Sequence, residues 1–295
     1  MVSTPSMGHA ARFAVSSVAN GTSGQEFDFV SCSIGKQSNL IIPDGIRGSR
    51  ARREETVVDG TYTVGGQVVL EPRPDDLTDL LPYILGANSV LAETLPEFYC
   101  FVDKGGDVYT YTGCKVNTAT FRSASNGTMQ LVLDIQGKTE DTTLTTLDAS
   151  SANTLSVLQP YVHHQGVLTL GNTAYECNNV ELTIDNALIL DRFNNTQTRD
   201  YLPESDRVVT LRCDNPFSSV EAAALYDIAR AGLTLNTWTV TNGNYSCIFS
   251  MANLKAPTRP VEVGARNQEI PLRLELQAFA TSALAELVVT NDAEA

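Results

Sequence analysis

The side chains that most often transfer protons or bind metals are scarce in this sequence. Its three histidines are His9, His163 and His164, which leaves few candidates for a histidine-based general acid or base. The adjacent rings of His163 and His164 would point to different faces of a strand or helix, so we expect no metal site there. The sequence contains none of the motifs GxSxG, GxxxxGKS/T and HExxH, which serve acyl transfer, phosphate binding and zinc proteolysis. We therefore predict no metal and no cofactor.

Carboxylates are the remaining candidates for chemistry, because the chain has 34 Asp and Glu residues. Two carboxylates that flank a glycosidic bond can act as acid and base, so a hydrolase stays open as an alternative. The adjacent pairs Glu54–Glu55 and Asp75–Asp76 stand out, but neighbouring carboxylates normally lie on solvated turns. We predict that the chain is not an enzyme.

The most unusual local feature is a basic run in an otherwise acidic chain. The run and the two carboxylates that follow it comprise Arg47, Arg50, Arg52, Arg53, Glu54 and Glu55. No aromatic residues interleave with the arginines, which disfavours stacking on nucleic acid bases. A loop that pairs with an acidic surface on a neighbouring subunit explains these residues without a ligand. A solvated loop and an anion site are the alternatives.

Length and charge limit the remaining classes of protein. The 295 residues suffice for two domains of ordinary size, and 42% of them are hydrophobic, enough to fill two cores. The net charge of −14 argues against attraction to nucleic acid phosphates. The six cysteines show no CxxC spacing, so we expect buried, reduced side chains. We expect neither a secretory signal nor a membrane span, which needs ~20 apolar residues.

Four segments of the first half return in the same order in the second half, at nearly constant spacing. Leu131–Gly137 returns at Leu272–Ala278, Val30–Ile34 at Val180–Ile184, Pro72 at Pro216 and Tyr109 at Tyr245. The ordered series indicates two copies of one fold. We predict a first β domain over residues 1–145, a linker over 146–160 and a second β domain over 161–295.

Alternating and β-branched segments predict that both copies are mainly β, each a sandwich or partial barrel with one helix. In the first copy we expect strands at 11–17 and 27–34, a polar loop at 35–55, a tight-turned strand pair at 57–70, a helix at 75–86 kinked or shortened by Pro82, and hairpins over 98–113 and 116–135. In the second we expect strands at 167–170 and 175–184, a polar loop at 185–206, a strand at 208–213, a helix at 218–232, a hairpin over 238–251 and a strand at 270–279. The second polar loop contains Arg192, Arg199 and Asp200 but lacks the dense basic run.

The order of these elements resembles the major tail tube proteins of long-tailed bacteriophages. The resemblance rests on the loop GIRGSRARREETVVDGTYTVGG (45–66), the segment PRPDDLTDLLPYILGA (72–87) and the paired hairpins. It implies a structural virion protein, assembled in the host cytoplasm, whose rings stack into a hollow tube through which DNA passes without specific binding. The inner strands of successive domains would form one β-barrel around the channel. Tape measure, terminator and distal tail proteins are the implied partners.

A duplicated chain would reach a six-domain ring as a trimer. The resemblance also implies that the long loops contact the adjacent ring or subunit, so we expect Arg47, Arg50, Arg52, Arg53, Glu54, Glu55, Arg192, Arg199 and Asp200 at such contacts. Distal tail proteins and tube-like baseplate or secretion components share this unit and remain alternatives. So does a carbohydrate-binding adhesion module, which would cluster exposed aromatic residues; Trp238, the one Trp, lies in an alternating strand where we expect core packing.

Overall fold

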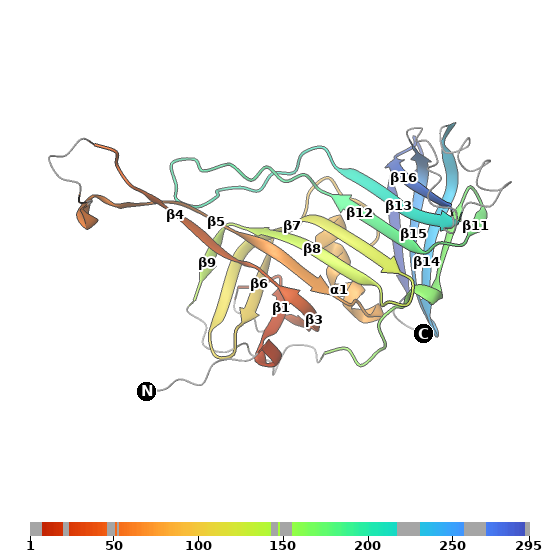
Figure 1. Cartoon of the computed structure of the whole chain (residues 1–295), viewed down its shortest axis with the longest axis horizontal. Helices are drawn as coiled ribbons and strands as arrows, with labels where there is room; N and C mark the ends of the chain where they lie inside the picture. The colour runs from red at the N-terminus through yellow and green to blue at the C-terminus, as the bar shows by residue number, and fades with distance from the viewer. Residues whose placement is uncertain are drawn as a thin grey trace.

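The computed structural model describes residues 8–19, 24–45, 51, 53–142, 147, 155–216, 231–256 and 270–292. The chain is mainly antiparallel β, as predicted, with helix α1 (Pro74–Leu85) beside the strands (Figure 1). Most of the helix expected at 218–232 lies outside the described residues, as do Arg47, Arg50 and Arg52. The same holds for most of the expected linker.

The strands fall into two halves with the same pairing scheme. The first half has β1 (Arg12–Ser16), β2 (Gln25–Phe27), β3 (Phe29–Cys32), β4 (Gly35–Ile41), β5 (Val58–Leu70), β6 (Phe98–Asp103), β7 (Val108–Ala124), β8 (Gln130–Gly137) and β9 (Thr139–Asp141). The second half has β10 (Gly166–Leu170), β11 (Thr173–Tyr175), β12 (Asn179–Asp185), β13 (Val208–Pro216), β14 (Leu233–Asn242), β15 (Tyr245–Lys255), β16 (Pro271–Phe279) and β17 (Leu287–Asp292).

Each kind of pairing in the first half has a counterpart in the second. Strand β1 pairs with β2 and β6, as β10 pairs with β11 and β14. Strand β5 pairs with β8 and with β3 and β4, as β13 pairs with β16 and β12. Strand β7 pairs with β6, β8 and β9, as β15 pairs with β14, β16 and β17.

One long ladder joins the halves. Residues Thr118–Ala124 of β7 pair antiparallel with Asn179–Asp185 of β12. The strands β3/β4, β5, β8, β7, β12, β13 and β16 therefore follow one another across a continuous sheet. In β8, β12 and β13 every second residue is buried, for example Leu131, Leu182 and Leu211, as expected when one face packs on a core and the other meets water.

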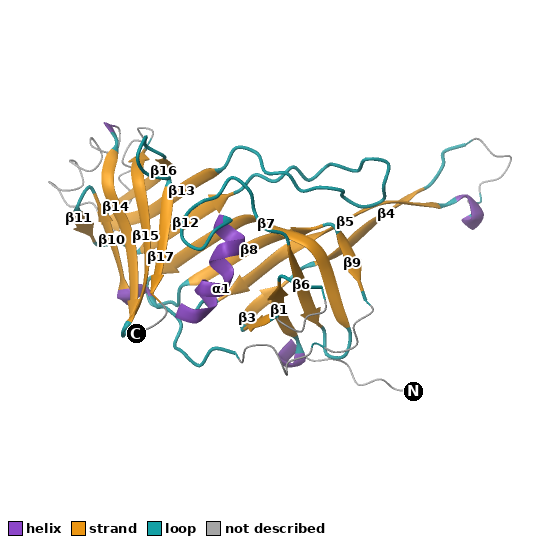
Figure 2. Cartoon of the chain, turned by 180° about the vertical axis from the view of Figure 1, so that it is seen from behind, coloured by secondary structure: helices purple, strands orange, loops and turns teal. Residues whose placement is uncertain are grey.

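Helix α1 follows the predicted apolar stripe, and its inward side chains Leu77, Leu81 and Ile84 are buried. It packs against the sheet near β7 (Figure 2). The backbone N–H of Arg73 donates to the Asp76 carboxylate at its start, and Gly86 ends it in the left-handed conformation. Pro82 does not shorten the helix, which runs on to Leu85; the kink, the other predicted effect of Pro82, stays a prediction.

Local turn signals were correct where they joined neighbouring strands. The hairpins β6–β7 and β14–β15 form as predicted, and Trp238 is buried against Phe249. The tight turn expected within 57–70 is wrong: β5 is one strand. Its Gly65 and Gly66 instead allow close approach, since a Cβ on Gly66 would lie 2.5 Å from the Ser33 carbonyl oxygen. Strands β4, β9 and β17 were not expected.

Candidate assembly surfaces

The exposed face of the continuous sheet is polar and excess acidic. The polar residues that cross-strand register places on this one face include Gln67, Thr118, Thr120, Arg122, Asp134, Glu181, Thr183, Asp185, Thr210, Arg212, Asp214, Arg273, Glu275 and Gln277. The same register also places Val69, Val132 and Val208 on it. Carboxylates outnumber guanidinium groups in this set. Arg212 lies between Glu181 and Glu275, at 3.3 and 3.1 Å. Its guanidinium donates to both carboxylates, and these hydrogen bonds, led by that to Glu275, raise the pKa of Arg212. Arg212 is therefore already paired with two carboxylates. Of the other two arginines on the face, Arg122 donates to the Gln130 side chain and Arg273 lies 3.8 Å from the Asp214 carboxylate.

The edge of this sheet at β3 is open. Strand β3 pairs with β5 along one edge, and no described strand pairs with its other edge. Val30 in β3 is 59% exposed, whereas its counterpart strand β12 is paired on both edges and buries every second side chain. An unpaired strand edge presents N–H and C=O groups that can extend a sheet into another chain.

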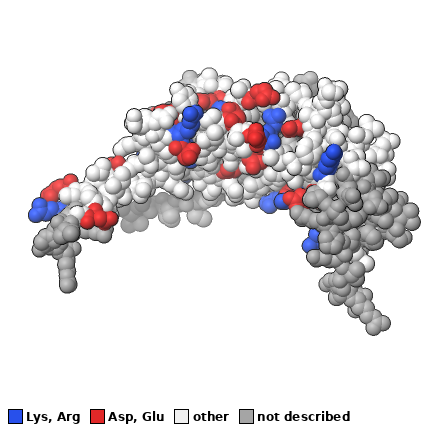
Figure 3. Space-filling view, turned by 90° about the horizontal axis from the view of Figure 1, so that it is seen from above, with Lys and Arg blue, Asp and Glu red and all other residues white. Residues whose placement is uncertain are grey.

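A two-stranded arm projects from the sheet at the start of β5, whereas β3 pairs with the end of β5 (Figures 1 and 3). We use "arm" for β4 and residues Val58–Thr63 of β5 with the described part of the segment between them. Pairing of β5 with β8 ends at Val64 and Gly137, so β4 is the only described strand that pairs with the arm part of β5. The cross-strand partners Ile41 and Val58 are 54% and 56% exposed. An isolated ribbon with exposed apolar side chains indicates a contact surface.

The corresponding connection in the second half, residues 186–207, has the opposite character. We call it the second loop. Backbone N–H groups donate across it from Ile189 to Pro203, from Asp200 to Arg192 and from Ser205 to Ala187. The loop is thus an irregular hairpin that lies along the body and reaches the base of the arm (Figure 1).

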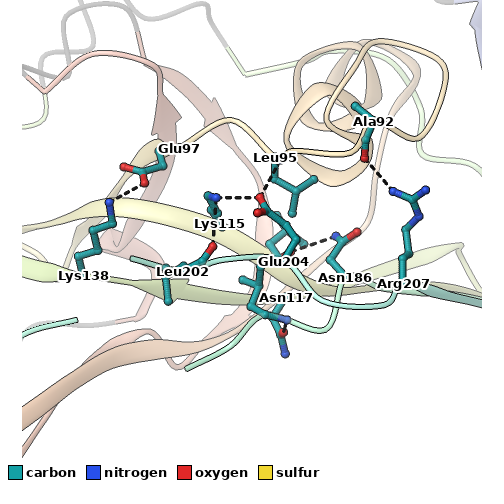
Figure 4. A network of polar contacts seen from close by, with 12 residues as sticks. Ala92, Leu95, Glu97, Lys115, Asn117, Lys138, Asn186, Leu202, Glu204 and Arg207 are labelled. Carbon is teal, nitrogen blue, oxygen red and sulfur yellow. Dashed lines mark hydrogen bonds and ion pairs between the residues drawn. The ribbon is translucent and has the colours of Figure 1, made fainter. Parts of the chain in front are cut away.

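Figure 4 shows how the base of the second loop is fixed to the first half. Lys115 of β7 contacts the Glu204 carboxylate at 2.7 Å and donates to the Leu202 carbonyl at 3.1 Å. Burial alone would raise the pKa of Glu204, but hydrogen bonds from Lys115 and the Leu95 amide outweigh it and leave the pKa below its ordinary value. Asn186 is buried and donates to the carbonyls of Ile84 and Val116.

A β-bulge helps to make this attachment possible. The β7–β8 register shifts between Val116 and Thr118, which releases Asn117 from the ladder. Its side-chain carbonyl then accepts from the Leu188 amide at 3.0 Å, and its backbone carbonyl accepts from the Asn186 amide at 2.8 Å. The asparagine therefore anchors the second loop at its first turn.

The predicted contact residues separate into two groups. Arg53, Glu54, Glu55 and Arg192 are exposed. Glu54 and Glu55 lie in the short 3-10 helix Glu54–Thr56. Asp200 is half-buried and its carboxylate accepts from Thr196. Arg199 is 6% exposed and bonds within the chain. Burial lowers the pKa of the Arg199 guanidinium, opposed by Asp134.

The sequence did not reveal the partners that hold the second loop. Lys115, Asn117 and Asn186 are single polar residues in or beside strands, and nothing in their spacing marks them as anchors. Among the described residues, no cluster of three or more His, Cys, Asp or Glu is arranged to hold a metal ion. No helix in the described part of the chain has the length and apolar character needed to cross a membrane.

An open strand edge and a projecting arm with exposed apolar side chains are features typical of proteins that associate with other chains. The comparison with protein families agrees, because the model of the phage tail tube protein family matches residues 3–278. The chain therefore belongs to the phage tail tube protein family. No curated protein matches it. Family membership makes it a structural component of the phage tail, which oligomerises into a tube with other tail proteins.

Proposed function

We propose that three copies of this chain close into a ring of six related units and that these rings stack into the tube through which DNA passes. The matching pairing schemes support two copies of one unit in each chain. The β7–β12 ladder joins the first unit to the second within the chain. The observation that carries the proposal is that the counterpart of β12 in the first unit, β3, is open.

The same ladder can be repeated between chains. By the correspondence of β7 with β15, the open edge of β3 would pair with a second copy beyond Leu254, the last residue of β15 that pairs with β14. Each such contact would hide an edge that otherwise invites aggregation. The contact between β3 of one copy and β15 of the next is head-to-tail, and such contacts form a closed ring when the rotation between copies closes. With three copies, this ring would contain six units.

The polar face of the sheet suits the wall of a DNA channel. Its opposite face is buried against the core, so only the polar face is available to line a lumen. Excess carboxylates repel phosphates, and the pairing of Arg212 with Glu181 and Glu275 removes a site at which DNA would bind. DNA would therefore slide along this wall without specific contacts.

The substitution Val30→Lys tests ring closure. A lysine on an open edge opposes the pairing of another strand, and Val30 is already 59% exposed, so the fold of the single chain should survive. We expect native mass spectrometry to show trimers for the wild type and for the control Val167→Lys, at a 51% exposed position in β10. Val30→Lys should give monomers. Trimers of unchanged stability in this variant would contradict the proposed contact.

The alternatives make different predictions. A carbohydrate-binding module would cluster exposed aromatic rings. Trp238 is 1% exposed and stacks on Phe249, and the exposed Tyr201 and Phe279, at 61% and 40%, lie in different elements, the second loop and the end of β16. A distal tail or baseplate component would form rings but not long polymers. Electron microscopy of the concentrated protein separates these functions, because the tube alone predicts long hollow filaments of uniform width.

A further inference from the structure

We infer that the second loop is an intrachain brace for the arm, and that each chain therefore offers one docking arm, not two, to a second copy in the adjacent ring. This inference deepens the proposed function and rests on it, since it assumes that rings stack. It departs from the symmetric expectation that both long loops make the same contact.

The tip of the second loop bonds to the arm where the arm leaves the sheet. The Tyr62 amide donates to the Gln197 carbonyl at 2.9 Å, and the Gln197 side chain donates to the Asp59 carbonyl at 3.2 Å. Both contacts lie beyond Val64, the last residue of β5 that pairs with β8. A two-stranded ribbon alone is marginally stable in water, so these added contacts fix the base of the arm in one direction.

Arg199 locks the tip of the second loop against the sheet. Its guanidinium donates to the carbonyls of Leu190 at 2.8 Å, Val64 at 3.1 Å and Gly137 at 3.4 Å, and to the Gln136 side chain at 3.1 Å. Val64 and Gly137 face each other in the last β5–β8 pair. The Arg199 guanidinium thus lies where the arm begins. Moving the loop away would leave the buried carbonyls of Val64 and Gly137 without this hydrogen-bond donor.

The base of the second loop is also fixed to the first half. Asn186 and the Lys115–Glu204 ion pair are largely buried in contacts with the first half. A loop fastened at both ends has no free length with which to reach another ring. The arm, in contrast, presents the exposed pair Ile41 and Val58 beyond the body.

The occupant of the arm surface is a second copy of this chain. The family assembles as a tube of repeated subunits, and the arm extends past the sheet that would form the ring. A ring of three chains would then carry three arms. Contacts between adjacent rings would follow three-fold symmetry, although the sheet around the channel is nearly six-fold.

The test compares Arg199→Met with the matched control Arg192→Met, which alters an exposed arginine in the same loop. Hydrogen–deuterium exchange of the rings reports on the arm through residues 58–63 and on the fold through residues 118–124. We expect Arg199→Met to speed exchange at 58–63 at least ten-fold, with 118–124 unchanged, and to give rings that form few tubes. Arg199→Lys, which keeps a donor, should fall between, and the exchange of Arg192→Met at 58–63 should match the wild type.

The other possible results separate the brace, the single-arm inference and the proposed function. Normal exchange at 58–63 and normal tubes in Arg199→Met would overturn the brace. If Arg199→Met loses protection at 118–124 as well, Gln197→Ala decides instead: we expect a two- to three-fold rise at 58–63, and no rise overturns the brace. A wild-type protein without rings or tubes would refute the proposed function, while the exchange comparison on single chains would still test the brace. Tubes in which residues 186–207 touch the next ring as the arm does would overturn the single-arm inference.

Discussion

The arm and the second loop occupy equivalent places in the pairing scheme, yet one extends into solvent and the other is fastened to the body. The arm comprises β4, the first residues of β5 and the described part of the segment between them, and it exposes apolar side chains such as Ile41 and Val58. The second loop connects β12 to β13 and inserts Asn186 and Arg199 among backbone carbonyls of the first half. Two connections in one scheme can therefore divide the work: one makes contacts between chains, and the other holds the first in place.

The largest expected effect is at the base of the second loop. Lys115→Met removes the partner of Glu204, and the two side chains are only 11% and 19% exposed. Breaking such a pair leaves a largely buried charge and costs about 3 kcal/mol of unfolding free energy. Urea denaturation measures the loss, and the double variant with Glu204→Gln is the control. A coupling energy below about 0.5 kcal/mol would show that the pair does not hold the loop.

Helix α1 also holds the second loop, because its Ile84 carbonyl accepts from the Asn186 side chain, and the stability of this helix depends on pH. Burial, opposed by the hydrogen bond from Arg73, raises the pKa of Asp76 from 3.8 to about 6. The folded state therefore favours the neutral carboxyl, and its contribution is full below pH ~4 and is lost as the pH rises through about 6.

The substitution Asp76→Asn tests this pH dependence. The wild-type free energy of unfolding should fall by up to about 3 kcal/mol between pH ~4 and ~6 from this group. The variant keeps an acceptor for the Arg73 amide and should lack that component. Denaturation at several pH values measures it, and parallel pH profiles of the two proteins would contradict the assignment to Asp76.

The smallest effect on stability, but a large one on assembly, is expected at the arm. The double substitution Ile41→Ser with Val58→Ser alters exposed side chains and should change the unfolding free energy by no more than about 0.5 kcal/mol. Tube formation, followed by light scattering, should be lost. The control Ile189→Ser, at a 41% exposed position in the second loop, should polymerise normally. Equal loss in both proteins would erase the distinction between the two regions.

Local signals in the sequence predicted much of the fold. The leucine stripe of α1 and the turn residues of the β6–β7 and β14–β15 hairpins act between near neighbours, so their meaning does not depend on the rest of the chain. Gly65 and Gly66 misled because the same residue type serves turns and close packing. Strand β4 was missed because GKQSNLI is paired on one side and buries no side chain.

The roles of the two long loops were beyond local reasoning. Arg192 and Arg199 lie in one polar segment and look alike in the sequence. Arg199 is buried where it donates to the carbonyls of Val64 and Gly137. These two residues are neighbours only because the β5–β8 register pairs them. The contact role of the basic run that includes Arg53 stays a prediction, as does the division into domains 1–145 and 161–295.

The most direct test of the account is electron cryomicroscopy of filaments grown from the purified wild-type protein. We predict hollow tubes whose rings contain three chains, with β3 of each chain extended by a strand of its neighbour and three arms reaching the next ring. Rings of six chains, or a protein that stays monomeric with β3 unpaired at high concentration, would contradict it.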